Sequence, residues 1–340
     1  MDHYKPPRPF VGFPVAMPAA PAVRLLTVDA ESAGQRLDNY LIRCLKGVPK
    51  TLVYRIIRSG EVRLNKGRAQ ADSRVQAGDT VRVPPVRVAE RATPDAAAVP
   101  SREFPLLFED ASLLAVDKPA GVAVHGGSGV SFGVIEQLRR ARPQAPLLEL
   151  VHRLDRETSG VLLVAKKRSA LKALQDQFRE RETAKTYLAL VQGDWPARLK
   201  VLDQPLVKFL LPDGERRVRV TRADDPDGQR ALTLVRVLGR STMPGSQPPS
   251  PMTLLAVTIK TGRTHQIRVH LAHAGHPIAG DDKYGDFEWN RQLHKAGMRR
   301  MFLHAWRLGI QHPLDARPLE LMAPLPAELH AFANIGAFID

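Results

Sequence analysis

The sequence contains a single cysteine, Cys44, among its 340 residues. One cysteine cannot form a disulfide within the chain, and without a second thiol it cannot anchor a structural zinc site. No apolar run reaches the roughly 18 residues that a membrane-spanning helix requires. The sequence therefore predicts a protein of a reducing, cytoplasmic compartment that has no membrane partner.

Acidic residues are too few to balance the basic ones. The chain has 50 lysines and arginines against 35 aspartates and glutamates, a formal net charge of +15. Nine basic residues and only two acidic ones fall between positions 36 and 68, so this tenth of the chain carries +7. Such a charge excludes few folds, but it favours a polyanionic partner, above all a nucleic acid.

Changes in composition along the chain predict four segments, which agrees with the roughly two domains expected from its length. Residues 1–22 contain six prolines and no basic start followed by an apolar stretch, so we expect a flexible tail rather than a signal peptide. A first domain covers residues 23–84. Residues 85–103 have the proline and alanine content of a linker, and residues 104–332 form the second domain.

The first domain combines a helical pattern with a strand pattern. Apolar residues recur about every four positions over 35–58, where Gly47 and Pro49 interrupt them, which predicts two short helices. Segments 61–65 and 77–84 alternate apolar and polar residues, which predicts two small strands.

In the second domain, strand-like runs outnumber the helix-like runs between them. This pattern predicts a mixed, largely antiparallel sheet with helices beside it. Ser169 is expected to cap a helix with one apolar face over 170–178. Thr264 is expected to cap another helix that Gly275 ends. The polar segment 212–230 is expected to be a surface excursion.

The segment VHRLDRETSG, residues 151–160, is the most unusual in the chain. Asp155 stands between Arg153 and Arg156, just before an apolar strand, and the Thr-Ser-Gly turn after it adds backbone donors. Cations and donors keep a carboxylate ionised, as a nucleophile requires. The alternative is an Arg–Asp pair that only braces a loop.

The segment TGRTHQIRVHLAHAGH, residues 261–276, has four histidines and two arginines. Its histidines lack the HExxH spacing and a neighbouring carboxylate, so we expect structural or exposed histidines and no metal site. Helical geometry would turn Ile267 and Arg268 toward the sheet. Arg268 is then placed to meet Asp155, unless it is an ordinary surface charge.

Two further motifs bear on binding. AKTYLALVQG places Tyr187 on a strand in a basic neighbourhood, where its ring could stack on a base for about 1–3 kcal/mol or pack in the core. DKPAGVAVHGG lacks both the GxxxxGK[ST] and the GxGxxG spacing. We therefore expect a structural turn there and no nucleotide cofactor.

Taken together and in this order, DKPAG, HRLDRETSG, KTYLALV and TGRTHQIRVH resemble the RluA-type family of RNA pseudouridine synthases. The basic region before them resembles an S4 RNA-binding domain, and the resemblance spans residues 25–325. It implies an α+β protein: a small S4 domain of the αL type and a catalytic domain built on a mixed, mostly antiparallel sheet with flanking helices.

The resemblance also implies roles for single residues. Asp155 would be the catalytic aspartate, and Arg153 would help displace the target base. Tyr187 would pack on the extruded uracil, Arg268 would pair with the aspartate, and Ile267 would line the substrate site. The residues implied to contact RNA in the S4 domain are Arg36, Lys50, Arg55, Arg58, Lys66 and Arg68.

The implied reaction detaches uracil N1 from ribose C1′, turns the ring, and joins C5 to C1′. This isomerisation consumes no electron acceptor, water or phosphate donor, so no cofactor is expected. The implied partner is large-subunit ribosomal RNA, and we expect a monomer. Whether Asp155 attacks C6, attacks C1′ or removes a proton stays open.

Two other functions compete with this one. A glycosidase would use Asp155 and Glu157 as carboxylates about 5–9.5 Å apart, but a neutral sugar does not explain a charge of +15. A non-catalytic RNA-binding or ribosome-assembly factor explains the charge but not a carboxylate set among arginines in the second domain.

Overall fold

The computed structural model describes residues 22–45, 48–86, 99–127, 132–212 and 214–333. The chain forms two compact units, Met1–Thr93 and Pro94–Asp340. The expected tail and most of the expected linker lie outside the described residues. Within the described part of the chain, no helix is long and apolar enough to cross a membrane.

The first unit packs two helices against a four-stranded antiparallel sheet of order β1-β4-β2-β3. Its elements are β1 (Arg24–Thr27), the 3-10 turn η1 (Ala30–Ser32), α1 (Leu37–Cys44), α2 (Lys50–Arg58), β2 (Arg63–Leu64), β3 (Gly67–Arg68) and β4 (Thr80–Val83). Leu37 and Leu41 of α1, Val53 of α2 and Val81 and Val83 of β4 are fully buried in one core. The predicted helix pair is confirmed: α2 starts directly after Pro49, whose ring fixes the backbone at its N-cap.

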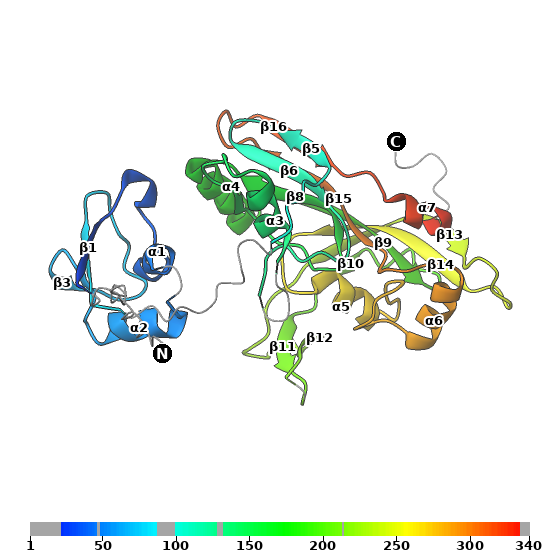
Figure 1. The fold of residues 1–340 in the computed structure, drawn as a ribbon. Coiled ribbons are helices and arrows are strands. Elements are labelled where there is room, and N and C mark those ends of the chain that lie inside the picture. The colour runs from blue at the N-terminus through cyan, green and yellow to red at the C-terminus, as the bar shows by residue number, and fades with distance from the viewer. Residues whose placement is uncertain (1–21, 46–47, 87–98, 128–131, 213, 334–340) are drawn as a thin grey trace, which may run out of the picture. The chain divides into compact units, whose positions relative to one another are not determined.

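The second unit is built on a ten-stranded sheet with helices on both faces (Figure 1). The strands of this sheet are β5 (Leu106–Glu109), β6 (Leu113–Lys118), β7 (Glu149–Leu150), β8 (Ser159–Ala165), β9 (Ala184–Gln192), β10 (Val201–Leu202), β13 (Thr233–Thr242), β14 (Pro251–Ile259), β15 (Leu303–Gln311) and β16 (Pro318–Met322). A separate two-stranded sheet consists of β11 (Leu206–Leu210) and β12 (Arg216–Val220). The helices of the second unit are α3 (Val134–Ala141), α4 (Arg168–Glu180), α5 (Gln266–His273), α6 (Phe287–Lys295) and α7 (Ala327–Ala333).

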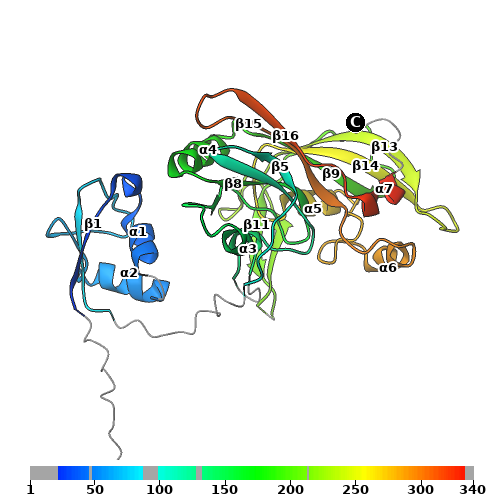
Figure 2. The same ribbon diagram turned by 45° about the horizontal axis from the view of Figure 1, so that its top comes forward.

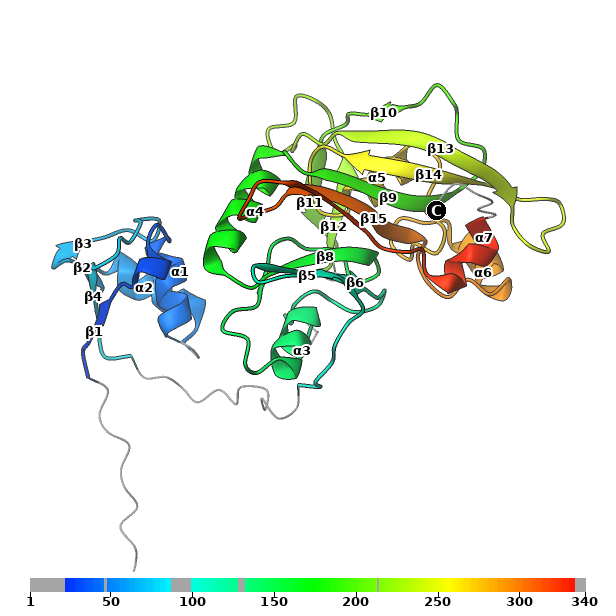
Figure 3. The same ribbon diagram turned by 90° about the horizontal axis from the view of Figure 1, so that it is seen from above.

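The sheet is mixed and mostly antiparallel, as the sequence predicted. Its main path runs β10-β13-β14-β9-β15-β8-β6-β5, and β15 with β8 is the parallel pair among the described strands (Figure 3). Gly160 lies at this junction with φ +109°, and a Cβ there would come within 2.2 Å of the Ala305 carbonyl oxygen. The close approach of the two strands therefore requires glycine.

Alternation along the strands divides the apolar residues between the two faces of the sheet. Leu162 of β8 packs with α3, whereas its neighbour Leu163 packs with α4. In β9, Ala189 belongs to the core beneath α5 and Leu188 to the core beneath α6 and α7. Helices α3 and α5 thus share one face with Tyr187, and α4, α6 and α7 cover the other. Figure 2 shows α6 and α7 toward the same end of the sheet.

Both predicted helix caps were wrong. Helix α4 begins at Arg168 with Lys167 as its N-cap, and α5 begins at Gln266 with His265 as its N-cap. Neither N-cap side chain makes a capping hydrogen bond. At α5 the Gln266 N–H donates to the Arg263 carbonyl (3.2 Å), so the backbone turn before the helix satisfies its first donor. The apolar face of α4 is confirmed, as is Gly275, which follows α5 with φ +83°.

The expected surface excursion over 212–230 contains a strand that the sequence analysis did not predict. Within it, β12 pairs with β11 along five residues of each strand, from Leu206↔Val220 to Leu210↔Arg216. The high arginine content hid the alternation that places Val218 in a small core with Leu206. The resulting β11–β12 hairpin extends away from the main sheet near α5 (Figure 1).

Candidate active site

Asp155 lies on the loop between β7 and β8, where backbone hydrogen bonds fix the chain. The Val151 N–H donates to the Leu163 carbonyl (3.2 Å), and the Thr158 N–H donates to the Asp155 carbonyl (3.1 Å). The Leu163 N–H donates to Nε2 of His152 (3.1 Å). Burial lowers the pKa of His152 to about 4, so the ring is neutral and its nitrogen can accept. The segment around Asp155 is therefore held rigidly against β8.

Lys118 joins the DKPAG turn to the same loop. Its fully buried ammonium group donates to the carbonyl oxygens of Pro119 (2.8 Å), Val122 (2.7 Å) and Arg156 (3.0 Å). Burial lowers the pKa of Lys118 to about 7. A side chain that satisfies three carbonyls is a structural brace, which fits the turn expected at this motif.

One cavity of about 120 Å³ brings together all five side chains that the sequence singled out in this domain. These residues are Arg153, Asp155, Tyr187, Ile267 and Arg268. They come from three places in the fold: the loop before β8, strand β9 and the first turn of α5. The Asp155 side chain is 23% exposed, and Arg153 is exposed.

Arg268 lies near Asp155, its expected partner, and binds Asp281 more closely. Arg268 and Asp281 form a buried bidentate pair, with Nε–Oδ2 at 2.7 Å and Nη2–Oδ1 at 2.6 Å. Nη1 of Arg268 faces Oδ2 of Asp155 at a longer distance, 3.7 Å. Burial opposes ionisation of Asp281, but Arg268 holds the pKa of Asp281 below its ordinary value. Asp281 thus fixes the Arg268 guanidinium, and this group places a positive charge beside Asp155.

The arginines next to Asp155 in sequence do not pair with it in the described structure. Arg156 binds Glu157 (Nε–Oε1 2.7 Å) instead. Among the described residues, the Asp155 carboxylate accepts no hydrogen bond. Its nearest basic side chains are Arg268, with Nη1 at 3.7 Å, and His265, with Nε2 at 3.8 Å. The carboxylate thus keeps acceptor capacity for a ligand.

Sequence reasoning missed His265, Asp281 and Tyr284. Nδ1 of His265 lies 2.8 Å from the Tyr284 hydroxyl, and Arg268 lies over the Tyr284 ring at 5.2 Å. His265 belongs to the quoted THQIR motif, so its spacing of three residues before Arg268 was an available signal. Asp281 and Tyr284 lie in a loop after α5, where no periodicity marks them.

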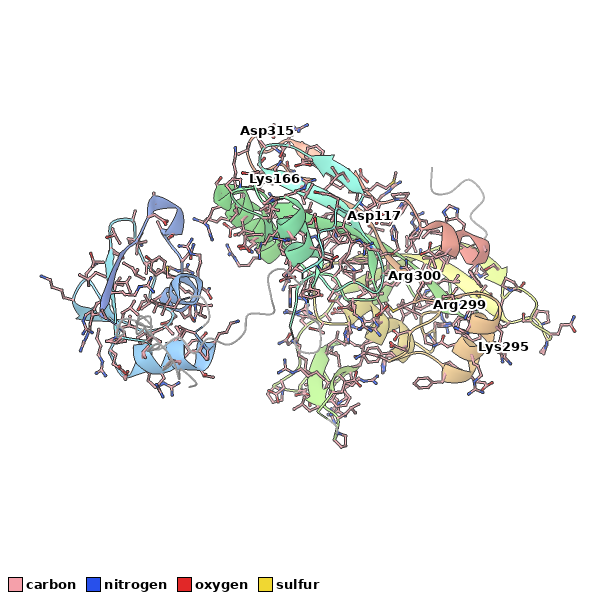
Figure 4. The ribbon with its side chains drawn as sticks, viewed as in Figure 1. Asp117, Lys166, Lys295, Arg299, Arg300 and Asp315 are labelled. Carbon is pink, nitrogen blue, oxygen red and sulfur yellow. The ribbon has the colours of Figure 1, made fainter. Side chains whose placement is uncertain are left out.

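Glu157 lines a different, larger cavity of about 690 Å³. Asp117, Arg299 and Arg300 line this second cavity (Figure 4). Nη2 of Arg300 donates to the Ser159 hydroxyl (2.6 Å), and burial raises the pKa of Asp117 to about 6. Because Asp155 and Glu157 line separate cavities, they do not form the facing pair that a glycosidase needs.

In the first unit, all six basic residues expected to contact RNA are exposed. Lys50, Arg55 and Arg58 lie on α2, and Lys66 and Arg68 lie at the β2–β3 turn. Arg36 differs from them because its Nη2 binds the buried Asp38 (2.7 Å) within the unit. Tyr54, which sequence reasoning missed, exposes 40% of its surface on α2 and donates to Asp38 (3.2 Å).

Comparison with known proteins gives consistent matches. Residues 112–273 match the family model described as RNA pseudouridylate synthase, and residues 35–81 match the S4 domain. Ribosomal large subunit pseudouridine synthase C of Pasteurella multocida is 51% identical over 312 residues, covering 91% of this chain and 92% of the relative. The protein of that name from Escherichia coli K12 is 50% identical over 311 residues, 90% of this chain and 94% of the relative.

Among solved structures, human RNA Pseudouridylate Synthase Domain Containing 1 is similar with a TM-score of 0.55 and 27% identity. The match covers 66% of this chain and 84% of the human one. The similarity therefore reaches the fold as well as the motifs.

Proposed function

Because this chain belongs to the RNA pseudouridylate synthase family, we propose that it converts uridines of large-subunit ribosomal RNA to pseudouridine with Asp155 as its catalytic carboxylate. The chain is a pseudouridine synthase. The substrate comes from the names of its relatives, which act on the ribosomal large subunit. These relatives align with 90–91% of this chain, which supports the same assignment.

One observation carries the role of Asp155. Its partly exposed carboxylate faces a small cavity that Tyr187 and Arg268 also line. A base inside a duplex or loop must leave its stack before an enzyme can act on its glycosidic bond. The cavity supplies a ring for stacking, a fixed cation and an acceptor with free lone pairs, and these are the groups that an extruded uracil requires.

The chemistry is an internal exchange of one bond for another. The N1–C1′ bond breaks, the uracil turns within the cavity, and C5 bonds to C1′; the proton on C5 leaves and N1 gains one. Atoms and electrons balance without a co-reactant. The enzyme therefore needs to hold the detached ring, exclude water and present one carboxylate at the sugar and base.

The residues around Asp155 divide this work. Arg268, fixed by Asp281, keeps positive charge beside the carboxylate. Tyr187 on β9 offers its ring to the uracil face, and burial raises the pKa of Tyr187 so that its hydroxyl stays protonated. We assign to the exposed Arg153, which lines the same cavity, the role of occupying the space that the extruded base leaves.

We propose that the first unit binds the rest of the RNA. The exposed lysine and arginines of α2 form a cationic face, and each phosphate neutralised releases counterions. We propose the corresponding domain limits: residues 23–84 for the S4 domain, 85–103 for the linker and 104–332 for the catalytic domain.

The test replaces Asp155 by Asn and uses Glu157→Gln as the matched control. Both variants lose one carboxylate from the same loop, but only Asp155 lines the proposed site. We expect Asp155→Asn to bind ribosomal RNA within about twofold of the parent and to form no pseudouridine, whereas Glu157→Gln keeps most activity. Pseudouridine is detected by carbodiimide-stop primer extension. Product from Asp155→Asn would refute the assignment.

A further inference from the structure

We propose that Tyr284 holds His265 as the neutral tautomer protonated on Nε2, and that His265 thereby orients the Asp155 carboxylate as a positioning residue. The inference rests on the proposed role of Asp155 and deepens it. The evidence is a continuous set of contacts that runs from β12 through Tyr284 and His265 to Asp155.

The hydrogen bonds of the Tyr284 hydroxyl define the tautomer. The Val218 N–H of β12 donates to this oxygen at 3.1 Å. A phenol has one proton to donate, and among the described residues its other polar neighbour within hydrogen-bond distance is Nδ1 of His265 at 2.8 Å. Donation to Nδ1 gives the hydroxyl proton a partner, whereas an Nδ1–H ring would leave that proton with none among the described residues, so we assign the lone pair to Nδ1.

The proton of the neutral ring then lies on Nε2. Burial lowers the pKa of His265 although Asp155 opposes this, so the neutral ring dominates at neutral pH. Nε2 faces Oδ2 of Asp155 at 3.8 Å. An N–H on Nε2 attracts the carboxylate, whereas the other tautomer would present a lone pair to it. A shift of about 1 Å closes this contact to a hydrogen bond.

The backbone at His265 supports a role beyond packing. His265 adopts φ +52° and ψ +21°, a left-handed conformation that is unfavourable for a non-glycine residue. Strain of this kind persists where the surrounding structure fixes it, often at functional sites. It places the imidazole, whose side chain is 15% exposed, between Tyr284 and Asp155.

Other charged groups surround this set of contacts and keep it in place. Arg268 and Arg217 lie over the Tyr284 ring at 5.2 and 5.8 Å. Arg217 donates to the Lys283 carbonyl, and Lys283 binds Glu215 of the hairpin. The charged groups that act on His265 are thus Asp155, Arg268, Lys283 and Asp281. The β11–β12 hairpin and the loop that contains Asp281, which flank the His265 ring, are therefore fixed by contacts that do not involve Asp155.

The first test measures the tautomer without RNA or catalysis. Nitrogen-15 NMR of histidine-labelled full-length protein distinguishes a protonated ring nitrogen from one with a lone pair, and His265→Gln identifies the signal by its loss. We expect protonation on Nε2 in the parent and a substantial Nδ1–H population in Tyr284→Phe. An Nδ1–H ring in the parent, or an unchanged ring in Tyr284→Phe, would overturn the inference.

The second test separates chemistry from binding. Misplacing a reacting group by about 1 Å costs on the order of 100-fold in rate. We therefore expect single-turnover rates at saturating RNA to fall tenfold to 100-fold in His265→Leu and Tyr284→Phe. The affinity of both variants for RNA should stay within about twofold of the parent. His265→Gln, whose amide nitrogen replaces the Nε2 donor, should recover most of the rate. The exposed His273→Gln on α5 is the matched control and keeps the parental rate.

Each outcome has a distinct meaning. Equal rates for His265→Gln and His265→Leu would show that no donor is needed and would overturn the positioning role. Affinity that falls together with rate would make the contacts structural, which also overturns it. If the parent itself forms no pseudouridine on ribosomal RNA, the proposed substrate fails while the NMR result still decides the tautomer. Thermal unfolding of each variant verifies that it is folded.

Discussion

At position 187, the aromatic face and the hydroxyl contribute separately. Tyr187 lines the cavity with Asp155, and no hydrogen bond to its hydroxyl occurs within the described residues. Stacking of one base on an aromatic ring contributes about 1–3 kcal/mol, about 5- to 150-fold in an equilibrium constant. We expect Tyr187→Phe to stay within about threefold of the parent and Tyr187→Ala to lose that larger factor. Single-turnover kinetics measures both; equal losses would mean that the ring face is irrelevant.

Asp281 is the residue on which Arg268 depends. Both side chains are at most 3% exposed, so Asp281→Asn leaves a buried guanidinium without its bidentate anion. Breaking a buried pair in this way costs about 3–5 kcal/mol, and we expect that loss in the free energy of unfolding by urea.

Asp282 supplies the matched control for this prediction. It lies 3.5 Å from the same arginine but is 70% exposed. Exposed pairs contribute about 0–1 kcal/mol, so Asp282→Asn should change stability little. Similar losses of unfolding free energy in Asp281→Asn and Asp282→Asn would show that the buried Arg268–Asp281 pair contributes no more to stability than the exposed pair.

At the scale of the element, α2 combines two different faces. Val53, Ile56 and Ile57 are buried in the core of the first unit, whereas its basic residues are exposed. Replacing Lys50, Arg55 and Arg58 by Gln leaves the buried face unchanged. For each phosphate that the variant no longer neutralises, the slope of log affinity against log salt falls by about 0.7–0.9. We therefore expect weaker RNA binding with a flatter salt dependence, measured by filter binding across a salt series.

Helix α4 offers a control of equal charge. Gln at the exposed Lys167, Lys172 and Arg179 removes the same three charges from the α4 region of the second unit. If the first unit makes the phosphate contacts, this control keeps the parental slope. Equal slopes for both triple variants would indicate a nonspecific effect of net charge.

The β11–β12 hairpin shows how an element can be fixed by a site. Its two strands have only a small apolar core, which includes Leu206 and Val218. Tyr284, Lys283 and the facing hairpin residues add polar contacts to that core. The hairpin and the Asp155 cavity are consequently one connected structure in the second unit.

For the molecule as a whole, buried neutral histidines set the acid limit of stability. Burial lowers the pKa of His304 to about 4. Nδ1 of its ring lies 2.8 Å from the Ser159 hydroxyl. The unfolded state binds this proton near pH 6.5 and the folded state only near pH 4. The contribution of His304 to the free energy of unfolding is therefore complete above pH 6.5. It is lost as the pH drops to about 4, a decrease of about 3 kcal/mol.

His304→Gln tests this contribution. The variant lacks the titrating ring, so its free energy of unfolding should fall less steeply between pH 6.5 and 4 than that of the parent. Urea unfolding at a series of pH values measures the difference between the two curves. Parallel curves would mean that His304 does not set the acid limit. His152, whose pKa burial also lowers to about 4, remains in both proteins and acts in the same direction.

Much of the fold followed from periodicity that each segment carries by itself. The helix pair of the first unit, the strand that holds Tyr187 and the apolar face of α4 all depend on residues close in sequence. The cap predictions at Ser169 and Thr264 failed because a side-chain cap is one of several ways to satisfy the first N–H groups of a helix. At α5 the Arg263 carbonyl accepts from the Gln266 N–H instead. Strand β12 was missed because arginines interrupted its alternation.

The sequence by itself determined the chemistry available to this protein: basic charge, one carboxylate in an arginine-rich motif, an aromatic residue on a strand and a family likeness carried by four motifs. Only the tertiary structure decided which groups meet. Asp281 and Tyr284 reach Arg268 and His265 from a loop after α5, and Glu157 turns away from Asp155 into another cavity. Such pairings depend on the packing of distant segments, and no local pattern in a chain encodes the distance between them.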